Sequence, residues 1–245
     1  MELSRFFAEN PAVALAYSGG VDSGFLLYAA VQAGCRVTAY YVKSPFQPEF
    51  EYNDACRLAK ELGAEMKVIF LDVLSNLCIA RNPENRCYHC KKAIMTAILE
   101  QAKKDGYSLL IDGTNASDDS ADRPGMAALA ELSVRSPLRE AGLTKSEIRR
   151  LSKEAGLFTW DKPAYACLAT RIPTGTAIIK ELLEKTEKAE SYLMTLGFRD
   201  FRLRQTGVLQ VTKDQLPLAK SLWEEITTKL KQDYPVLTLE ERYGS

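Results

Sequence analysis

The stretch Ala12–Ser23, which reads AVALAYSGGVDS, decides the fold of this chain. Residues 12–17 form a short apolar run that is typical of a strand buried on both faces. Gly19 and Gly20 then allow a tight turn, and the apolar pattern of a helix resumes at Phe25–Val31. A strand, a glycine turn and a helix start together direct backbone N–H groups to one place, where the helix dipole adds partial positive charge. The stretch therefore predicts a loop that binds phosphate.

The polar side chains of this loop can complete a nucleotide site. The hydroxyls of Ser18 and Ser23 can donate to phosphate oxygens, and the carboxylate of Asp22 can hold Mg²⁺. The commoner nucleotide fingerprints, G-x-x-x-x-G-K-S/T and a G-x-G-x-x-G that follows a strand, are absent from the sequence. Residues 18–23 instead read SGGVDS, which resembles the signature of the PP-loop ATP pyrophosphatases. This resemblance implies that ATP is cleaved between its α- and β-phosphates, giving an adenylylated intermediate and pyrophosphate.

Composition narrows the class of partner. The chain has 245 residues, of which 46% are hydrophobic and 26% charged, as in ordinary globular proteins. Its 32 basic and 32 acidic side chains cancel, so no global field favours nucleic acid or a membrane surface as partner. No apolar run approaches the roughly 20 residues of a membrane span, and the first residues lack the apolar core of a signal peptide. We expect a cytoplasmic protein.

Strands and helices alternate along the first two thirds of the chain. The expected strands, besides the first, are 36–42, 66–71, 108–111 and 132–136, and the expected helices are 1–9, 24–33, 49–62 and 91–104. This alternation predicts an α/β fold, a Rossmann-like parallel sheet with helices on both faces. Ligands then bind at the carboxyl ends of the strands. By the PP-loop resemblance, Ser44 and the Gly113–Thr114 turn at that edge hold adenine and ribose.

The character of the sequence changes between Ile172 and Thr176. Beyond this point we expect a long helix at 177–196, strands at 201–203 and 208–211, a helix at 215–231 and a strand at 236–239. The pattern predicts two domains, a PP-loop domain at 1–175 and a small α+β domain at 176–245.

The chain has six cysteines. In the reducing compartment expected for this protein, cysteines more often bind metals, act in catalysis or are buried than form disulfides. Three of them are interpreted as small buried hydrophobic residues: Cys35, Cys56 and Cys78. Cys87 and Cys90 form a C-x-x-C pair that suits half of a zinc site, a redox pair or cluster ligands. A second C-x-x-C is absent, which argues against a four-cysteine zinc ribbon. The one histidine, His89, is interpreted as an exposed loop residue.

Two further loops carry candidate functional residues. The segment 163–175 begins with a proline and ends with a proline and a glycine, which is typical of a loop. It contains Cys167 and Arg171, and an arginine can bind phosphate or carboxylate. The segment 113–125 follows a strand end and contains Asp119 and Arg123. An ordinary solvated loop is the alternative interpretation of the second segment.

Taken together, the motifs SGGVDS, GTNASDDSADRPG and ACLATRIPTG, in this order, resemble the LarE family. The resemblance covers about residues 10–211. It implies an ATP-dependent sulfur transferase that helps to build the nickel-pincer nucleotide cofactor. In the family, AMP is attached to a carboxylate of a pyridinium dicarboxylate mononucleotide, and sulfur then displaces AMP to give a thiocarboxylate. The resemblance also implies a homo-oligomer.

The resemblance places the sulfur chemistry on Cys167. Some members of the family have this cysteine alone, and it gives up its own sulfur and becomes dehydroalanine. Others add a C-x-x-C, and the three cysteines hold a [4Fe-4S] cluster whose open iron binds sulfide. Cys87, Cys90 and Cys167 indicate the cluster type, and three thiolates do leave one iron open. A disulfide relay and zinc with a bound water stay open as alternatives.

The tail and the loops supply candidate anion-binding residues. Arg202 and Arg204 alternate along one expected strand and so share a face. The family has basic residues here that bind the nucleotide phosphate, although Gln205 stands where many members have histidine. We expect Asp119, Arg123 and Arg171 to position substrate or phosphates, Asp22 and Cys167 to be catalytic, and ATP, Mg²⁺ and a sulfide source to be required.

Other functions fit parts of the same pattern. A PP-loop tRNA thiolase would also use cysteines, but it needs a basic, aromatic surface that neutral charge does not favour. A nucleotide-binding regulatory or iron–sulfur scaffold protein would have no turnover. An amide-forming PP-loop ligase has no need of three cysteines.

Overall fold

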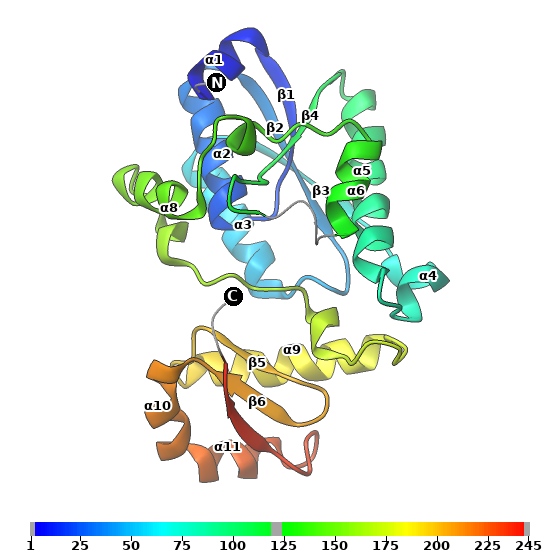
Figure 1. Cartoon of the computed structure of the whole chain (residues 1–245), viewed down its shortest axis with the longest axis vertical. Helices are drawn as coiled ribbons and strands as arrows, with labels where there is room; N and C mark the ends of the chain where they lie inside the picture. Colours follow the sequence, from blue (N-terminus) through cyan, green and yellow to red (C-terminus); the bar gives the residue numbers. More distant parts are fainter. Residues whose placement is uncertain (1–2, 119–123, 243–245) are drawn as a thin grey trace. The chain divides into compact units, whose positions relative to one another are not determined.

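The computed structural model describes residues 3–118 and 124–242 (Figure 1). The chain forms two compact units, one of residues 1–73 and 85–162, the other of residues 74–84 and 163–245. The boundary predicted at residue 175 falls inside the second unit, which begins earlier and also takes in the segment 74–84. The segment that contains Cys167 therefore belongs to the second unit.

The first unit is built on a parallel sheet of four strands in the order β3-β2-β1-β4. The strands are β1 (Ala12–Ala16), β2 (Arg36–Lys43), β3 (Glu65–Phe70) and β4 (Leu110–Asp112). Val13 and Leu15 pack into the core on one face, and Ala14 and Ala16 into the core on the other. Burial on both faces explains why β1 reads as an unbroken apolar run.

Helices cover both faces of this sheet, as predicted (Figure 1). The helices of the unit are α1 (Leu3–Glu9), α2 (Val21–Gln32), α3 (Glu49–Glu61), α5 (Arg86–Lys104), α6 (Pro124–Glu131), α7 (Pro137–Glu140) and α8 (Lys145–Glu154), with a short 3-10 helix η2 (Phe158–Asp161). Figure 1 shows α2, α3 and α8 on one side of the sheet and α5 and α6 on the other. The predicted α/β class is confirmed.

Several predicted elements are wrong in extent. The expected strand at 132–136 is a single bridge, in which Arg135 pairs with Ile111, because Ser133 has a left-handed φ of 54° and Pro137 starts α7 directly afterwards. Helix α5 begins at Arg86 rather than at residue 91, so the C-x-x-C pair and His89 lie in its first turns and not in a loop. Helix α2 begins at Val21, directly after the glycine turn.

The second unit is a small α+β structure. Its sheet has the order β5-β6-β7, with β5 and β6 antiparallel and β6 and β7 parallel. Its elements are α4 (Leu77–Ala80), η3 (Leu168–Arg171), α9 (Lys180–Thr195), β5 (Phe201–Leu203), β6 (Val208–Val211), η4 (Lys213–Gln215), α10 (Leu216–Ser221), α11 (Trp223–Leu230) and β7 (Thr238–Glu241); η1 (Val73–Ser75) leads into it. The helix expected at 215–231 is thus two helices that meet at Leu222. None of the helices in the described ranges is long and apolar enough to cross a bilayer.

The structure also corrects two of the three cysteines expected to be buried. Cys35 is buried as predicted, whereas Cys56 is half-buried and Cys78 is exposed. Cys78 lies on the four-residue helix α4, which is too short to present a continuous buried face.

Candidate functional site

The phosphate loop joins the carboxyl end of β1 to the first turn of α2. Gly19 has a left-handed φ of 73°, and Gly20 is the N-cap residue of α2 with no side-chain capping bond to the helix. A glycine is required at position 19, since a Cβ there would lie 2.7 Å from the Cβ of Ala55 on α3. The uncapped start of α2 leaves its first N–H groups able to bind an anion.

Two serine hydroxyls line this turn. The Oγ atoms of Ser18 and Ser23 lie 3.0 Å apart, and the backbone N–H of Ser18 donates to Ser23 Oγ at 3.2 Å. Ser23 is buried in the turn. The two hydroxyls therefore hold the loop in its folded shape at the start of α2.

Gly113 and Thr114 follow β4 and lie against the phosphate loop. A Cβ on Gly113 would be 2.8 Å from the backbone nitrogen of Ser23, so only glycine lets the turn approach this closely. Thr114 is buried and donates its hydroxyl to Asp112 Oδ2 at 2.6 Å. The structure thus brings this turn, predicted to hold ribose, beside the phosphate loop.

Asp112 organises the end of β4, and sequence reasoning missed it. Its Oδ1 accepts from the hydroxyl of Ser136 at 2.6 Å, and its Oδ2 lies 3.9 Å from the ammonium of Lys91 on α5. The signal that could have found it is an acidic residue at the carboxyl end of a buried strand, directly before Gly113. Through Asp112, the lysine that follows Cys90 is linked to the ligand-binding edge of the sheet.

Asp22 lies in the first turn of α2 and is paired with a lysine that the sequence did not indicate. Lys145 Nζ lies 2.5 Å from Asp22 Oδ2. The other oxygen, Oδ1, is buried and receives no hydrogen bond from the described residues. Burial raises the pKa of Asp22, and the ammonium of Lys145 opposes that rise. An unpartnered carboxylate oxygen at the phosphate loop fits a divalent cation, whose preferred ligands are such oxygens.

Ser44 follows β2 at the same edge of the sheet, because β2 pairs in parallel with β1. It is buried, its hydroxyl donates to Gln47 Oε1 at 2.6 Å, and it accepts from the backbone N–H of Phe46 at 3.2 Å. These bonds fix a tight turn after β2, one strand away from the phosphate loop.

The C-x-x-C pair occupies the first turns of α5. Cys87 is exposed and Cys90 is half-buried. At a spacing of three residues on a helix, the two side chains share a face. The buried guanidinium of Arg86 donates to Cys87 Sγ at 3.5 Å, and His89 stacks edge-on against Tyr88 with ring centres 5.2 Å apart.

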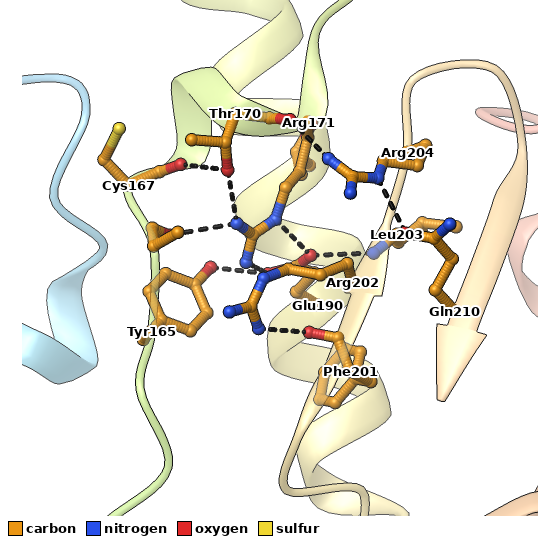
Figure 2. Close-up of polar contacts among 12 residues, drawn as sticks. Tyr165, Cys167, Thr170, Arg171, Glu190, Phe201, Arg202, Leu203, Arg204 and Gln210 are labelled. Atoms are coloured by element: carbon orange, nitrogen blue, oxygen red, sulfur yellow. Dashed lines mark hydrogen bonds and ion pairs between the residues drawn. The ribbon is translucent and has the colours of Figure 1, made fainter. Parts of the chain in front are cut away.

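Cys167 lies in the second unit, half-buried, directly before η3 (Figure 2). Its carbonyl accepts from both the N–H and the hydroxyl of Thr170, at 3.0 and 2.8 Å. In Figure 2 its sulfur points away from the arginine network behind it. The two bonds from Thr170 fix the backbone at Cys167.

Arg171 is paired with a glutamate that sequence reasoning missed. Its guanidinium, 1% exposed, makes two bonds to the carboxylate of Glu190 on α9, at 2.8 and 3.0 Å. It also donates to the carbonyl of Ala166, beside Cys167, at 2.9 Å. Burial acts to lower the pKa of Arg171, but the bonds and charge of Glu190 outweigh it, and the pKa is raised. Direct phosphate binding by Arg171 stays a prediction. The contacts that Arg171 makes here stabilise residues 163–175, which we call the Cys167 segment.

Glu190 accepts two more hydrogen bonds in this network (Figure 2). The hydroxyl of Tyr165 donates to it at 2.5 Å and the N–H of Leu203 on β5 at 2.9 Å. Burial, followed by the charge of Glu190, raises the pKa of Tyr165. One buried carboxylate therefore ties the Cys167 segment, α9 and β5 together.

Arg202 and Arg204 both donate to backbone carbonyls of the Cys167 segment. Arg202 reaches the carbonyl of Ala164 at 2.8 Å, and Arg204 reaches that of Thr170 at 2.6 Å. Burial, with the nearby charges of Arg171 and Arg242, lowers the pKa of Arg202 to about 10 and also lowers that of Arg204. The two guanidinium groups lie close enough to Arg171 and Arg242 for these charges to add to the effect of burial.

The candidate residues fall into two groups, one in each unit. The first comprises the phosphate loop, Ser44 and the Gly113–Thr114 turn, with the C-x-x-C pair on the same unit. The second comprises Cys167 with its arginines. Asp119 and Arg123 lie outside the described residues. Within the described ranges, no three side chains of His, Cys, Asp or Glu gather as a metal site.

Comparison with known proteins places the chain in a family. The family model of the thiamine biosynthesis protein ThiI matches residues 7–192. An uncharacterized protein of Synechocystis sp. is 38% identical over 82% of this chain and 76% of its own length. The pyridinium-3,5-bisthiocarboxylic acid mononucleotide synthase of Lactiplantibacillus plantarum is 35% identical over 85% of this chain and 75% of its own length.

A more distant similarity reaches tRNA-modifying enzymes. A tRNA-specific 2-thiouridylase of Thermotoga sp. is 22% identical over 59% of this chain and 52% of its own length. The residues matched by the family model include the phosphate loop and Cys167. The chain therefore belongs to the LarE family of PP-loop ATP-dependent sulfur transferases.

Proposed function

We propose that the protein adenylylates a carboxylate of a pyridinium dicarboxylate mononucleotide and exchanges the AMP group for sulfur. The product is a thiocarboxylate for the nickel-pincer cofactor. The observation that carries this proposal is the phosphate loop, where the start of α2 has no side-chain cap and the buried Oδ1 of Asp22, in the first turn of α2, has no hydrogen-bond partner among the described residues. The relative from L. plantarum, named as a synthase of a bisthiocarboxylic acid mononucleotide, supports the substrate class.

In the first step the chain positions ATP and neutralises its charge. The N–H groups of α2, with Gly19, Gly20 and the hydroxyls of Ser18 and Ser23, would bind the phosphates of the leaving pyrophosphate. Asp22 would hold Mg²⁺, which supplies charge neutralisation when bound. Ser44, Gly113 and Thr114 would hold the adenosine. A substrate carboxylate oxygen then attacks the α-phosphorus, the bond to the β-phosphate oxygen breaks, and a mixed anhydride forms.

In the second step sulfur replaces AMP at the activated carbonyl. We assign the anionic substrate to the positive surroundings of Arg202 and Arg204, and assign substrate or phosphate positioning also to Arg171, Asp119 and Arg123. Attack of a sulfur nucleophile on the carbonyl carbon expels AMP, which keeps the oxygen that was once part of the carboxylate. AMP is a much better leaving group than the oxygen of a free carboxylate, so sulfur can take the place of that oxygen.

Cys87, Cys90 and Cys167 are proposed as the ligands of a [4Fe-4S] cluster that, when bound, offers an open iron to sulfide. Their chemistry fits, because none of the three cysteines is in a disulfide and the first two share a helix face. Self-sacrifice of the Cys167 sulfur is the alternative. In that case the C-x-x-C pair would have another role.

Two hydrogen bonds of Asn82 within the second unit support the three-cysteine proposal. Gly175 N–H donates to the carbonyl of Asn82 at 2.8 Å, and the Asn82 side chain donates to the carbonyl of Pro173 at the same distance. This tether joins the chain just before Cys87 to the chain just after Cys167. Cys87 follows Asn82 by five residues and Cys167 precedes Pro173 by six, and segments of these lengths span at most about 18 and about 22 Å.

The reaction is proposed for the cytoplasm, where ATP is plentiful and thiols stay reduced. A homo-oligomer stays a prediction. The tRNA thiolase alternative has only the distant similarity in its favour.

The experiment that tests the proposed function measures pyrophosphate and AMP release from ATP in the presence of the dicarboxylate mononucleotide. Asp22→Asn should lower pyrophosphate release by about 100-fold or more, since electrostatic stabilisation of the leaving group is lost. Asp214→Asn, the same substitution at an exposed aspartate of the second unit, should leave the rate unchanged. Unchanged release by Asp22→Asn would show that the scheme is wrong.

A further inference from the structure

Lys145 is placed at the phosphate loop by contacts of its own backbone. Its N–H, at the start of α8, donates to the hydroxyl of Ser117 at 3.0 Å, and the N–H of Ala116 donates to the carbonyl of Leu143 at 2.8 Å. The start of α8 is thereby fastened to the chain that follows Gly113, which itself packs on Ser23. The backbone of Lys145 is therefore held in place, and only its side chain reaches across to Asp22.

The surroundings of Asp22 distinguish Lys145 from the other groups that act on its charge. Asp118 adds negative charge, and Arg149 adds positive charge. The guanidinium of Arg149, however, is held by the carbonyls of Trp160 and Lys162, at 2.6 and 2.8 Å. The side chain of Lys145 is 34% exposed and contacts Asp22 through its end. A lysine on a flexible four-carbon stem can therefore leave Asp22 while the arginine stays in place.

We propose that Lys145 is the resident counter-ion of Asp22, displaced when Mg²⁺ enters with ATP, and that it then pairs with the pyrophosphate leaving group. This inference rests on the proposed function. An ammonium 2.5 Å from one carboxylate oxygen and a divalent cation on the same carboxylate repel each other, so the two compete. The phosphates that arrive with the metal give the released ammonium a new partner within the reach of its side chain.

The proposal predicts effects of opposite sign for one substitution. In Lys145→Met the competing charge is gone, so a divalent cation alone should bind more tightly than in the wild type. The same variant lacks a cation for the leaving group, so pyrophosphate release should fall. A residue that only supports the fold would weaken both.

The test uses the full chain and two readouts. Mn²⁺ is titrated without nucleotide and followed by electron paramagnetic resonance, and pyrophosphate release is measured with Mg²⁺, ATP and the carboxylate substrate. Lys145→Met and Lys145→Gln should bind Mn²⁺ several-fold more tightly and release pyrophosphate roughly tenfold or more slowly. Lys145→Arg keeps the charge and should bind Mn²⁺ as the wild type does. Lys153→Met, on the exposed side of the same helix, should change neither readout.

Unchanged or weaker Mn²⁺ binding in the folded Lys145→Met and Lys145→Gln variants would overturn the proposal, whatever happens to the rate. Tighter Mn²⁺ binding with an unchanged rate would overturn the role toward the leaving group. Failure of the proposed function itself looks different, because Asp22→Asn would then keep its full rate. If Asp22→Asn is inactive and the Lys145 variants move neither readout, only this inference fails.

Discussion

At the scale of single residues, Gly113 shows how the ligand-binding edge depends on the lack of a side chain. Gly113→Ala would place a methyl group 2.8 Å from the backbone nitrogen of Ser23, which cannot move without shifting the phosphate loop. We expect the variant to lose about 1–3 kcal/mol of unfolding free energy through overpacking and to bind ATP several-fold more weakly. Urea unfolding and calorimetric titration with ATP check the two effects.

Gly34→Ala is the matched control for this prediction. Gly34 has a left-handed φ of 69°, but a Cβ there meets open space. The control should therefore lose stability through backbone strain while its ATP affinity is unchanged. Equal ATP affinity in Gly113→Ala and the wild type would contradict the claim that this turn shapes the nucleotide site.

Glu190 carries the second prediction at this scale. Glu190→Ala leaves the buried guanidinium of Arg171 without its anion and should cost about 3–5 kcal/mol of unfolding free energy. Glu184→Ala, which breaks the exposed pair with Lys180 on the same helix, should cost less than about 1 kcal/mol. Denaturant unfolding of both variants decides the point. Similar small losses would mean that the network does not hold the Cys167 segment.

The residues that sequence reasoning found and missed differ in one respect. Ser18, Gly19 and Asp22 stand in one contiguous motif, so their grouping was readable from the chain itself. The partners Lys145 and Glu190 lie 123 and 19 residues away from the groups they bind, and no local pattern marks such pairs. Only the fold brings them into contact.

At the scale of elements, the alternation of strands and helices was predictable because each has its own hydrophobic period. The start of α5 was not. Cys87, Tyr88 and His89 are weak helix formers, so intrinsic propensity does not mark the start of this helix. At 132–136 the apolar residues favour a strand, but the structure has only one bridge there. The helix α7 begins at Pro137 directly afterwards, so the pairing does not continue.

The placement of the C-x-x-C pair in one helix leads to a third prediction. Cys87→Ala should abolish iron and sulfide binding by protein purified without oxygen, because the cluster would lose one of its three ligands. Cys78→Ala, at an exposed cysteine outside the proposed set, should retain both. Iron and sulfide are quantified beside the visible absorption spectrum.

Two outcomes would contradict the cluster. In the first, Cys87→Ala and Cys78→Ala hold equal iron. In the second, the wild-type protein is colourless and its mass falls by one sulfur atom per turnover, as expected if Cys167 gives up its own sulfur.

At the scale of the whole molecule, the residues proposed to carry the reaction are divided between two units. The phosphate loop and the C-x-x-C pair belong to the first, whereas Cys167 and its arginines belong to the second. The sequence indicated two domains but placed the boundary at 175, because the chain changes its pattern there while its contacts change at 162. The segment 74–84 belongs to the second unit, where Asn82 donates to the carbonyl of Pro173 five residues before Cys87 in the chain.

In the proposed function, AMP is attached to the substrate carboxylate before sulfur attacks the carbonyl carbon. The most direct measurement supplies the substrate with ¹⁸O in its carboxylates, together with ATP, Mg²⁺ and sulfide, and weighs the products by mass spectrometry. We expect one ¹⁸O atom in each AMP released and none in pyrophosphate. Label in pyrophosphate, or AMP released without label while thiocarboxylate forms, would contradict it.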